Sequence, residues 1–311
     1  MKNCFIGMDG GGTKTAVTVA DENGTVLETF KSGGMNYNGQ DSHLIEQSFA
    51  DIFARLRQKG YLEHCLSMCI GAAGTSNPVV EKKITEQVRR QGYSSQSLYI
   101  AGDHEIALCG AHGRLKGMIL IAGTGSICFG AGEDGTVLRS GGFGYLIDDE
   151  GSGYAIGRDI LSAVVRASDG RISETLLSRQ AFEFLGLQTI PELIKFVYHE
   201  STGKKEIAAL SILLPEACAA GDAAALSIAD KCADELVKLV VPVADKLGAQ
   251  AGQLALSGSV LQKDVLIQRK FKNELQQLYP NIACIEPKFD AAYGAVLLAK
   301  GKWQQKAGHA L

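Results

Sequence analysis

A glycine-rich hairpin occurs twice in this 311-residue chain, with corresponding residues 111 positions apart. The first copy opens at Gly12-Thr13 and ends with GTVL at residues 24–27. The second opens at Gly123-Thr124 and ends with GTVL at residues 135–138. In both copies a short apolar run precedes the glycines, and β-branched residues and a second turn follow, which is the pattern of an antiparallel strand meander. The repeat predicts two similar domains, each beginning with such a meander.

Helix-like and strand-like segments alternate after each meander. The first meander is followed by a helix, strand, helix, strand and helix at residues 43–59, 67–72, 79–90, 97–100 and 103–110. The second is followed by helices over 154–247, then a strand, helix, strand and helix at 253–256, 264–278, 283–285 and 290–300. The order predicts an α/β fold with a mixed sheet and flanking helices in each half. Pro242 is expected to kink or break the helix predicted over 223–247.

The domain boundary is expected where the second meander begins. We predict an N-terminal domain over residues 1–115, joined by the closing helix over 290–311, and a C-terminal domain over 116–289 that carries a helical insertion. No low-complexity linker separates the halves, so a hinge and a cleft between two facing domains are expected.

Composition excludes several classes of function. With 46% hydrophobic and 21% charged residues the chain resembles an ordinary globular protein, and a net charge of −3 offers no broad positive field for nucleic acid or anionic membrane. The short apolar run near the start has no cleavage site, and no 18-residue apolar run occurs, so a cytoplasmic location is expected. The eight cysteines include no CxxC pair, which favours reduced thiols over a metal or cluster site.

The two glycine turns are candidate phosphate sites. Glycine keeps Cβ out of the way and tolerates positive φ, so that backbone N–H groups can converge on an anion, although plain β-turns would look alike. The pattern GxxxxGK[ST] is absent, which excludes the usual P-loop. Lys14 could neutralise phosphate charge or be a solvated surface lysine. The predicted phosphate-binding residues are Gly10, Gly11, Gly12, Thr13 and Lys14 in the first turn and Gly123, Thr124, Gly125 and Ser126 in the second.

Two acids are candidates for phosphoryl-transfer chemistry. Asp9 precedes the first turn, whereas Leu120 occupies the position matched to it by the repeat; a carboxylate beside a phosphate site commonly organises Mg²⁺. Asp103 follows a predicted strand and opens a helix. It could be the helix N-cap, and it could also accept a proton from an attacking hydroxyl, because ligands bind at the carboxyl ends of strands in α/β sheets.

Three further loops have the composition of ligand contacts. Residues 141–158, GGFGYLIDDEGSGYAIGR, combine glycines and acids as expected of a pocket for a hydroxyl-rich ligand, although Asp149 and Glu150 could simply cap the next helix. Asn36 lies in a polar loop that could be a surface turn. Gly258 and Ser259 form a small-residue turn that could support an adenine ring or only join a strand to a helix.

Together these motifs resemble the superfamily of actin, sugar kinases and Hsp70-like ATPases. Within it the chain is similar to the branch of N-acetylglucosamine, N-acetylmuramate and glucosamine kinases and BadF/BadG/BcrA/BcrD-type ATPases. MDGGGTKT and IAGTGS resemble the phosphate elements, LSGSV the adenosine element, and GAAGT and FDAAYGAVL the interdomain connectors. The resemblance implies two ribonuclease H-like domains, each with a mixed five-stranded sheet and flanking helices, related by duplication.

The resemblance also implies an activity and residue roles. GDHEIAL is similar to the segment that carries the catalytic aspartate, here Asp103, and GGFGYLIDDEGSGY to the sugar-binding stretch. The implied reaction is Mg²⁺-dependent transfer of the ATP γ-phosphate to the 6-hydroxyl of N-acetylglucosamine and/or N-acetylmuramic acid, and homodimers are common in the superfamily. The implied substrate residues are Asn36, Gly142, Phe143, Asp149 and Glu150, with Gly142 to Gly144 against the acetamido group.

Alternatives to this activity stay open at the level of sequence. Some N-acetylglucosamine kinases have tryptophans where this chain has Phe143 and Asn38, which leaves the acceptor sugar undecided, with glucosamine as an alternative. An ATPase activator of a partner enzyme would be expected to carry cluster-binding cysteines. A sugar-sensing repressor would be expected to have a DNA-binding segment before the first meander.

Overall fold

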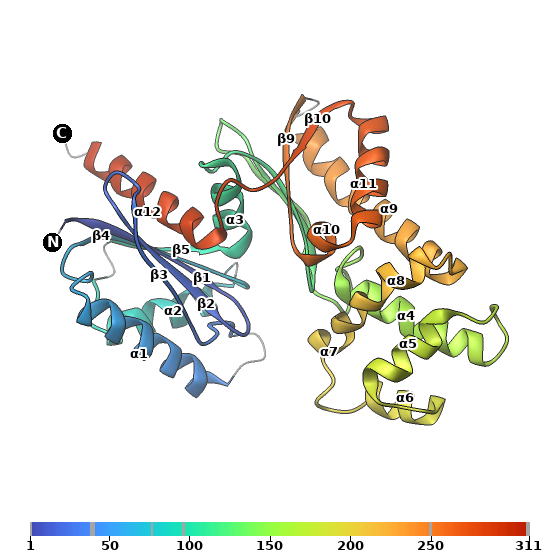
Figure 1. Cartoon of the computed structure of the whole chain (residues 1–311). Coiled ribbons are helices and arrows are strands. Elements are labelled where there is room, and N and C mark those ends of the chain that lie inside the picture. Colours follow the sequence, from blue (N-terminus) through green and yellow to red (C-terminus); the bar gives the residue numbers. More distant parts are fainter. Residues whose placement is uncertain (1, 38–40, 76, 95–96, 249–250, 309–311) are drawn as a thin grey trace. The chain divides into compact units, whose positions relative to one another are not determined.

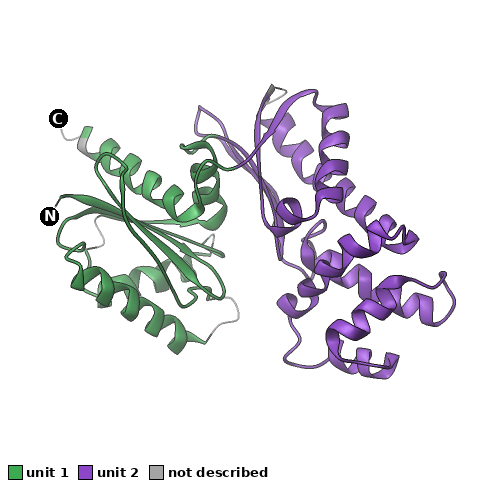
Figure 2. Cartoon of the chain, in the orientation of Figure 1, with its two compact units in different colours: residues 1–116, 287–311 green, residues 117–286 purple. Residues whose placement is uncertain are grey.

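The chain divides into two units, each built on one five-stranded mixed sheet (Figures 1 and 2). Unit 1 comprises Met1–Lys116 and Pro287–Leu311, and unit 2 comprises Gly117–Glu286. The computed structural model describes residues 2–308 except 38–40, 76, 95–96 and 249–250. Asn38 therefore lies outside the described residues.

The two sheets have the same topology. Their strand orders are β3-β2-β1-β4-β5 and β8-β7-β6-β9-β10, with the first three strands in sequence antiparallel and the last two added in parallel. The strands of unit 1 are β1 (Cys4–Gly10), β2 (Thr15–Asp21), β3 (Val26–Ser32), β4 (Cys65–Ala72) and β5 (Leu98–Gly102). Those of unit 2 are β6 (Gly117–Ala122), β7 (Ser126–Ala131), β8 (Val137–Gly141), β9 (Ala251–Ser257) and β10 (Asn281–Ile285). The predicted fold class is confirmed.

The repeated hairpin is reproduced in backbone detail. The N–H of Asp21 donates to Thr25 O at 2.9 Å, and the N–H of Gly132 donates to Thr136 O at 2.8 Å. The glycines that precede these threonines adopt nearly the same φ, 87° at Gly24 and 83° at Gly135. Residues 111 positions apart therefore occupy equivalent places in this turn.

The glycine turns themselves differ in length. Residues 11–14 connect the paired ends of β1 and β2, whereas residues 123–125 connect those of β6 and β7, so that the second turn is one residue shorter. Asp9 pairs with Ala16, and the residue paired with the equivalent Ile127 is Ile121. The predicted match of Asp9 to Leu120 is therefore one residue off, because a constant sequence offset does not allow for the shorter turn.

Helices cover both faces of the unit 1 sheet. Cys4, Ile6 and Met8 of β1 point into a core shared with α1 (Ser42–Gln58) and α2 (Pro78–Arg90). Phe5 points to the opposite face, where α3 (Asp103–His112) and α12 (Ala291–Gly308) pack (Figure 1). The central strand is thus buried on both sides, as its continuous apolar sequence indicates.

Helix α12 lies directly on β1 and α3. A Cβ added at Gly7 would stand 2.2 Å from the carbonyl oxygen of Ala292, and one added at Gly294 would stand 1.9 Å from that of Ile106. Both backbones therefore approach closer than any side chain would allow. The last helix of the chain is in this way an integral layer of the N-terminal unit.

Unit 2 has a larger helical layer. A single buried core joins β6, β7 and β9 to helices from the long insertion and from the end of the unit. Its helices are α4 (Gly153–Ser168), α5 (Leu176–Leu185), α6 (Ile190–Val197), α7 (Lys204–Ala209), η2 (Leu210–Leu213), α8 (Leu214–Ala219), α9 (Ala223–Lys246), α10 (Ser259–Lys263) and α11 (Val265–Leu278).

Pro242 does not break α9, so that part of the expectation is wrong. The helix runs without interruption from Ala223 to Lys246 with Pro242 inside it. A proline in a helix interior costs about 3 kcal/mol because a hydrogen bond is lost and the ring crowds the preceding turn. Val240, Val243 and Ala244 are fully or almost fully buried on both sides of the proline, and this packing against the core holds the helix together.

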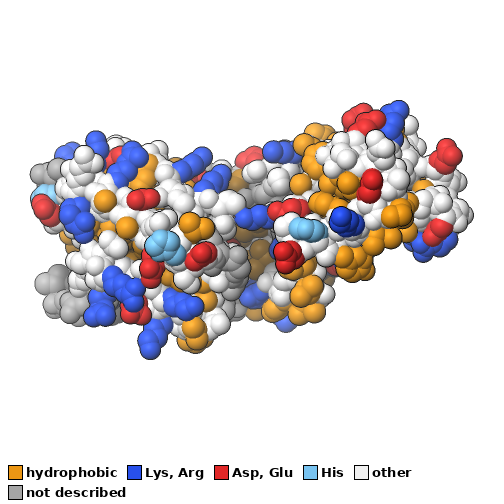
Figure 3. Space-filling model, turned by 90° about the horizontal axis from the view of Figure 1, so that it is seen from below, with side chains coloured by type: hydrophobic (Ala, Val, Ile, Leu, Met, Phe, Trp, Pro, Cys, Tyr) orange, Lys and Arg blue, Asp and Glu red, His pale blue; other side chains and the backbone are white. Residues whose placement is uncertain are grey.

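The surface charges, the helices and the cysteines can be compared with what the composition predicts. On the face drawn in Figure 3, acidic and basic side chains are interspersed over each unit. No single helix among the described residues is long and apolar enough to cross a membrane; the segments Lys204–Ala219 and Ala223–Lys246, bent by 118°, reach the required length and composition only as a pair. All eight cysteines are free, and six of them are buried.

Candidate functional site

The carboxyl ends of three parallel strands meet at one edge of the unit 1 sheet. Gly10 of β1 pairs with Ala72 of β4, and Ala72 pairs with Gly102 of β5. Asp9 stands one residue before the end of β1, and Asp103 directly follows β5. The sheet therefore brings the two predicted acids to the same edge, where α/β proteins bind ligands.

Asp103 is the first residue of α3 and not its cap. The N-cap is Gly102, whose backbone N–H donates to Glu105 Oε2 at 2.6 Å. The N-cap position that the sequence allows for Asp103 is therefore occupied by Gly102. The Asp103 side chain remains 52% exposed, and its Oδ1 accepts from the backbone N–H of His104 at 3.0 Å and lies 3.2 Å from His104 Nδ1.

The electrostatic surroundings of Asp103 favour its ionised form. Partial burial opposes ionisation, but the hydrogen bonds from His104 and the charge of its ring outweigh that effect and lower the pKa of Asp103. The carboxylate is therefore charged at neutral pH and able to accept a proton.

Asp9 belongs to an acidic cluster with Asp103 and Asp290. Burial is the main cause that raises the pKa of Asp9 to about 6; repulsion from Asp103 and Asp290 adds to it, and Lys14 opposes it. Asp290 precedes α12, where its Oδ1 accepts from Tyr293 N–H at 2.8 Å. The sequence places Asp290 at the start of the closing helix and in the FDAAYGAVL connector segment, but does not indicate that this residue lies near Asp9.

The acidic cluster suits a hard divalent cation. Carboxylate oxygens are preferred ligands of Mg²⁺, and the repulsion from Asp103 and Asp290 that contributes to the raised pKa of Asp9 would be relieved by a bound cation. No group of three or more His, Cys, Asp and Glu side chains in the described ranges is arranged to hold a metal ion by itself. The residues thus fit a cation bound through one or two carboxylates, water and phosphate oxygens.

The first glycine turn carries the loop that contains Asn36. The N–H of Gly11 donates to Lys14 O at 3.1 Å, and the N–H of Met35 donates to Gly11 O at 3.0 Å. Asn36 directly follows Met35, so unit 1 brings it next to the turn. Thr13 and Lys14 are exposed, and Gly12 is partly buried.

Positive φ, one of the two reasons that the sequence suggests for these glycines, does not apply in either turn. Gly10, Gly11, Gly12, Gly123 and Gly125 all have φ outside that region. Space explains at least two of them: a Cβ at Gly10 would stand 3.2 Å from Gly71 O, and one at Gly125 would stand 2.7 Å from Lys204 Nζ.

Unit 2 contains a pocket of about 460 Å³ beside the second glycine turn. Its volume is within the range of small-molecule sites. The pocket brings together Gly123 and Thr124 of the predicted phosphate turn and Ser259 of the predicted adenosine turn. The other lining residues come from α4, α7, η2, α8 and α10 and from Asp264: Gly153, Ile156, Lys205, Ala208, Ala209, Ser211, Ile212, Pro215, Val260, Lys263 and Asp264.

Gly258 allows the predicted adenosine turn to approach the end of β6, where the second glycine turn begins. Its φ is 92°, and a Cβ at this position would stand 2.2 Å from Ala122 O. Any other residue would be strained by this conformation and would also push β9 away from the end of β6.

Asp149 holds the end of the second glycine turn, residues 123–125, by hydrogen bonding. Its Oδ1 accepts from the backbone N–H of Ser126 at 3.2 Å, and its Oδ2 accepts from Lys204 Nζ at 2.6 Å. The Asp149 side chain is only 3% exposed, and its backbone has the unusual φ of 66°. Ser126 Oγ donates to Glu150 O at 2.6 Å, so both Ser126 donors are used inside the unit. Lys204 comes from a region in which the sequence shows no motif, and we did not predict it.

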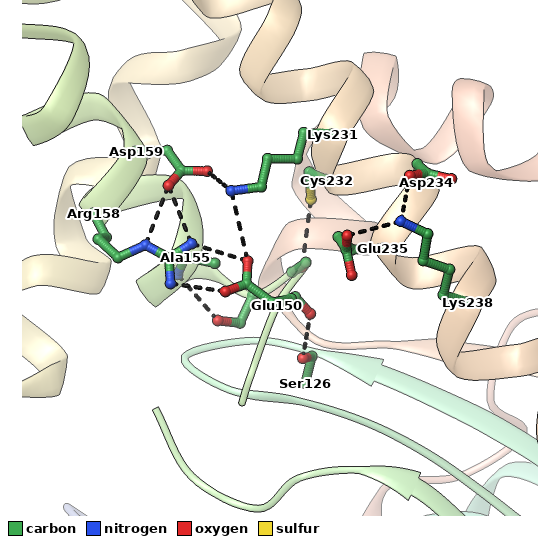
Figure 4. Close-up of polar contacts among 12 residues, drawn as sticks. Ser126, Glu150, Ala155, Arg158, Asp159, Lys231, Cys232, Asp234, Glu235 and Lys238 are labelled. Carbon is green, nitrogen blue, oxygen red and sulfur yellow. Dashed lines mark hydrogen bonds and ion pairs between the residues drawn. The ribbon is translucent and has the colours of Figure 1, made fainter. Parts of the chain in front are cut away.

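Glu150 belongs to an ion-pair network (Figure 4). Its two oxygens accept from Arg158 at 2.8 and 2.9 Å, and Arg158 also donates to Asp159. Lys231 of α9 completes the network through Asp159 at 2.7 Å. The hydrogen bonds from Arg158 are the main cause that lowers the pKa of Glu150. The network fastens the loop before α4 to α4 and α9.

The loop with Gly142 and Phe143 follows β8 in the same unit. The Phe143 side chain is 63% exposed, and its backbone N–H donates to Asp148 Oδ2 at 2.9 Å. The guanidinium carbon of Arg139 lies 4.3 Å from the centre of the Phe143 ring.

The two duplicated sheets, together with a carboxylate at a strand end and a glycine-turn pocket, define an ATPase of the actin and sugar kinase superfamily. The chain belongs to the BadF/BadG/BcrA/BcrD ATPase family, whose sequence profile matches residues 6–299. The predicted resemblance is therefore confirmed, and family membership supports ATP as the nucleotide.

Individual relatives match over nearly the whole chain. An N-acetylmuramic acid/N-acetylglucosamine kinase of Clostridium acetobutylicum is 34% identical, over 96% of this chain and 98% of the relative. An N-acetyl-D-glucosamine kinase of Dictyostelium discoideum is 31% identical, over 96% of this chain and 98% of the relative. A crystal structure from Chromobacterium violaceum, provisionally named an N-acetylglucosamine kinase, superposes with a TM-score of 0.76 at 25% identity, covering 96% of this chain and 99% of the other.

Proposed function

We propose that this protein is an ATP-dependent amino-sugar kinase that transfers the γ-phosphate to the 6-hydroxyl of N-acetylglucosamine and/or N-acetylmuramic acid. The observation that carries the proposal is the pocket of unit 2, in which Gly123 and Thr124 lie beside Ser259. The names of the two relatives described above supply the acceptor class.

Unit 2 would bind the nucleotide. The backbone of Gly123 to Gly125 and the Thr124 hydroxyl would receive phosphate oxygens, and Lys204 would add a positive charge. Gly258 and Ser259 would support the adenosine. Asp149 is committed to Ser126 and Lys204, and Glu150 to Arg158, so we assign both acids the positioning of this turn in place of direct sugar contact.

Unit 1 would supply the acid–base group and the cation site. Asp103 would accept the proton of the attacking hydroxyl, since its carboxylate is ionised and half-exposed. Asp9 with Asp290 would hold Mg²⁺, which neutralises phosphate charge when bound. The first turn, Gly10 to Lys14, would contact phosphate, and Asn36 would contact the sugar.

Gly142 and Phe143 would line the acetamido side of the sugar from unit 2. Phe143 presents an exposed apolar ring against which a sugar face can pack. A cytoplasmic location and a homodimer complete the proposal.

The test is ADP release from Mg-ATP by the purified protein without sugar and with glucose, glucosamine, N-acetylglucosamine and N-acetylmuramic acid. We expect ADP with one or both N-acetylated sugars and little without sugar. ADP release that ignores every sugar would overturn the proposal and favour an activator ATPase.

A further inference from the structure

Arg139 holds a guanidinium beside the loop that we assign to the sugar. The side chain belongs to β8, and its Nη2 donates to the carbonyl oxygens of Gly141 at 3.0 Å and Gly142 at 2.8 Å. Its Nε lies 3.3 Å from the same Gly141 oxygen, and the group lies over the Phe143 ring. The position of the cation is therefore defined by three separate contacts.

The backbone beneath Arg139 is specialised for this arrangement. Gly141 and Gly142 have φ of 75° and 74°, a left-handed conformation that side chains other than glycine rarely adopt. Two consecutive residues in this conformation turn both carbonyl groups toward Arg139. The conformation of these two glycines thus orients the guanidinium of Arg139.

The charge of Arg139 is not neutralised within the described part of the chain. Its contacts are neutral carbonyl oxygens and an aromatic ring, no carboxylate of the described residues forms an ion pair with it, and its Nη1 donates to none of them. The side chain is exposed. Nε and Nη2 are used by the two carbonyl oxygens, and within the described residues the Nη1 amino group remains free to donate a charge-assisted hydrogen bond, for which a carboxylate is a strong acceptor.

In the proposed binding mode, N-acetylmuramic acid would bring a carboxylate near Nη1 of Arg139. On the proposed function, the acetamido group at C2 of the sugar lies against Gly142 to Gly144. C3 is the next ring carbon, and in N-acetylmuramic acid it carries a lactyl ether that ends in a carboxylate. In N-acetylglucosamine the same carbon carries only a neutral hydroxyl.

We propose that Arg139, fixed by the Gly141 and Gly142 carbonyls and the Phe143 ring, is the binding site for the lactyl carboxylate of N-acetylmuramic acid. This inference rests on the proposed function and deepens it, because it assigns the acceptance of the acidic sugar to one side chain. The free Nη1 group of the guanidinium donates to the carboxylate, while N-acetylglucosamine binds without that contact.

The test compares kcat/KM for three acceptors: N-acetylglucosamine, N-acetylmuramic acid and the neutral methyl ester of N-acetylmuramic acid. The variants are Arg139→Gln and, as a matched loss of an exposed arginine on α5, Arg179→Gln. Loss of a charge-assisted hydrogen bond corresponds to about 10- to 100-fold in affinity. We expect Arg139→Gln to lose that factor for N-acetylmuramic acid through KM, and less than about threefold for N-acetylglucosamine.

The methyl ester and the Arg179→Gln control distinguish a direct contact with the carboxylate from a structural role of Arg139. The wild-type protein should use the methyl ester about as poorly as Arg139→Gln uses the acid, and Arg179→Gln should match wild type with every sugar. Equal losses for both sugars in Arg139→Gln would make the residue structural and overturn the inference. Wild-type activity with N-acetylglucosamine but not N-acetylmuramic acid would overturn it while leaving the kinase intact. Activity with no sugar would refute the proposed function itself.

Discussion

Lys204 Nζ lies 2.6 Å from Oδ2 of Asp149, a carboxylate with only 3% of its side chain exposed. The same nitrogen occupies the space in which a Cβ of Gly125 would stand. The insertion between α4 and α9 therefore delivers a cation to the second glycine turn. With 29% of its side chain exposed, Lys204 is able to meet a phosphate oxygen without leaving Asp149.

Replacing Lys204 should weaken nucleotide binding. We expect Lys204→Met to raise the KM for ATP about 10- to 100-fold, since a charge-assisted contact to phosphate is lost. Steady-state kinetics with varied ATP measures this, and Lys195→Met on α6 is the matched control with an exposed lysine. An unchanged KM for ATP would remove Lys204 from the nucleotide site.

The same variant leaves Asp149 buried without its partner, which costs about 3 to 5 kcal/mol of stability. The double variant Lys204→Met/Asp149→Asn removes the buried charge. It should recover much of the midpoint of thermal unfolding without recovering ATP affinity. Recovery of both would show that Lys204 acts only by stabilising the fold.

Asp103→Asn should abolish most of the turnover. Loss of a general base typically costs about 10² to 10⁴ in kcat, and sugar KM should change little because the effect arises in the transition state. Since the pKa of Asp103 is lowered, its protonation should not reduce wild-type kcat between pH 7 and about pH 5. Asp51→Asn on α1 serves as the exposed control. Near-normal kcat in Asp103→Asn would contradict the assignment.

Gly258→Ala should destabilise unit 2 and weaken ATP binding. A Cβ at residue 258 would clash with Ala122 O, and the φ of 92° adds strain of about 1 to 3 kcal/mol. Gly252→Ala is the matched control in β9, because nothing lies within 4 Å of the added Cβ and φ is not positive there. Thermal unfolding should separate the two variants clearly. Equal midpoints would refute the close approach of the two turns.

Asp222 should make a pH-dependent contribution to stability. It caps α9, and its carboxylate accepts from Ala225 N, Leu176 N and Thr175 Oγ1, thereby joining the starts of α9 and α5. Burial opposes ionisation, but these hydrogen bonds outweigh it and lower the pKa of Asp222. Asp222→Asn should therefore cost about 1 to 3 kcal/mol at neutral pH.

The sign of the pH effect follows from the lowered pKa. The contribution of Asp222 is fully present above the unfolded-state value of about 3.9 and is lost as pH falls through the lower folded-state value. Denaturant unfolding of wild type and Asp222→Asn should differ by the same free energy from pH 7 to about pH 5, with the gap closing below pH 4. A gap that widened in acid would contradict the prediction.

Sequence patterns predicted the elements well where a local signal exists. The repeat of GTVL identified two equivalent hairpins, and the alternation of strands and helices predicted two sheets that the structure confirms. Asp103 was placed at a strand end by local pattern alone. These predictions depend only on periodicity and turn chemistry within a few residues.

Features that depend on distant parts of the chain were not accessible. Asp290 reaches Asp9 only because α12 packs on β1, and Lys204 reaches Asp149 across 55 residues. The register of the second turn differs by one residue because its connection is shorter, which a constant offset conceals. The packing of α9 likewise overrides the local tendency of Pro242 to end a helix.

The packing of α12 on β1 determines when unit 1 can complete its fold during synthesis. Unit 2 is one continuous stretch, whereas the sheet of unit 1 needs residues 291–308 to cover the face that carries Phe5 and Gly7. Domains generally fold as units while the chain emerges. The N-terminal sheet is made first yet must wait, with one apolar face uncovered, until residues 291–308 have been synthesised. During that interval a chaperone that covers the exposed apolar face would protect the chain most.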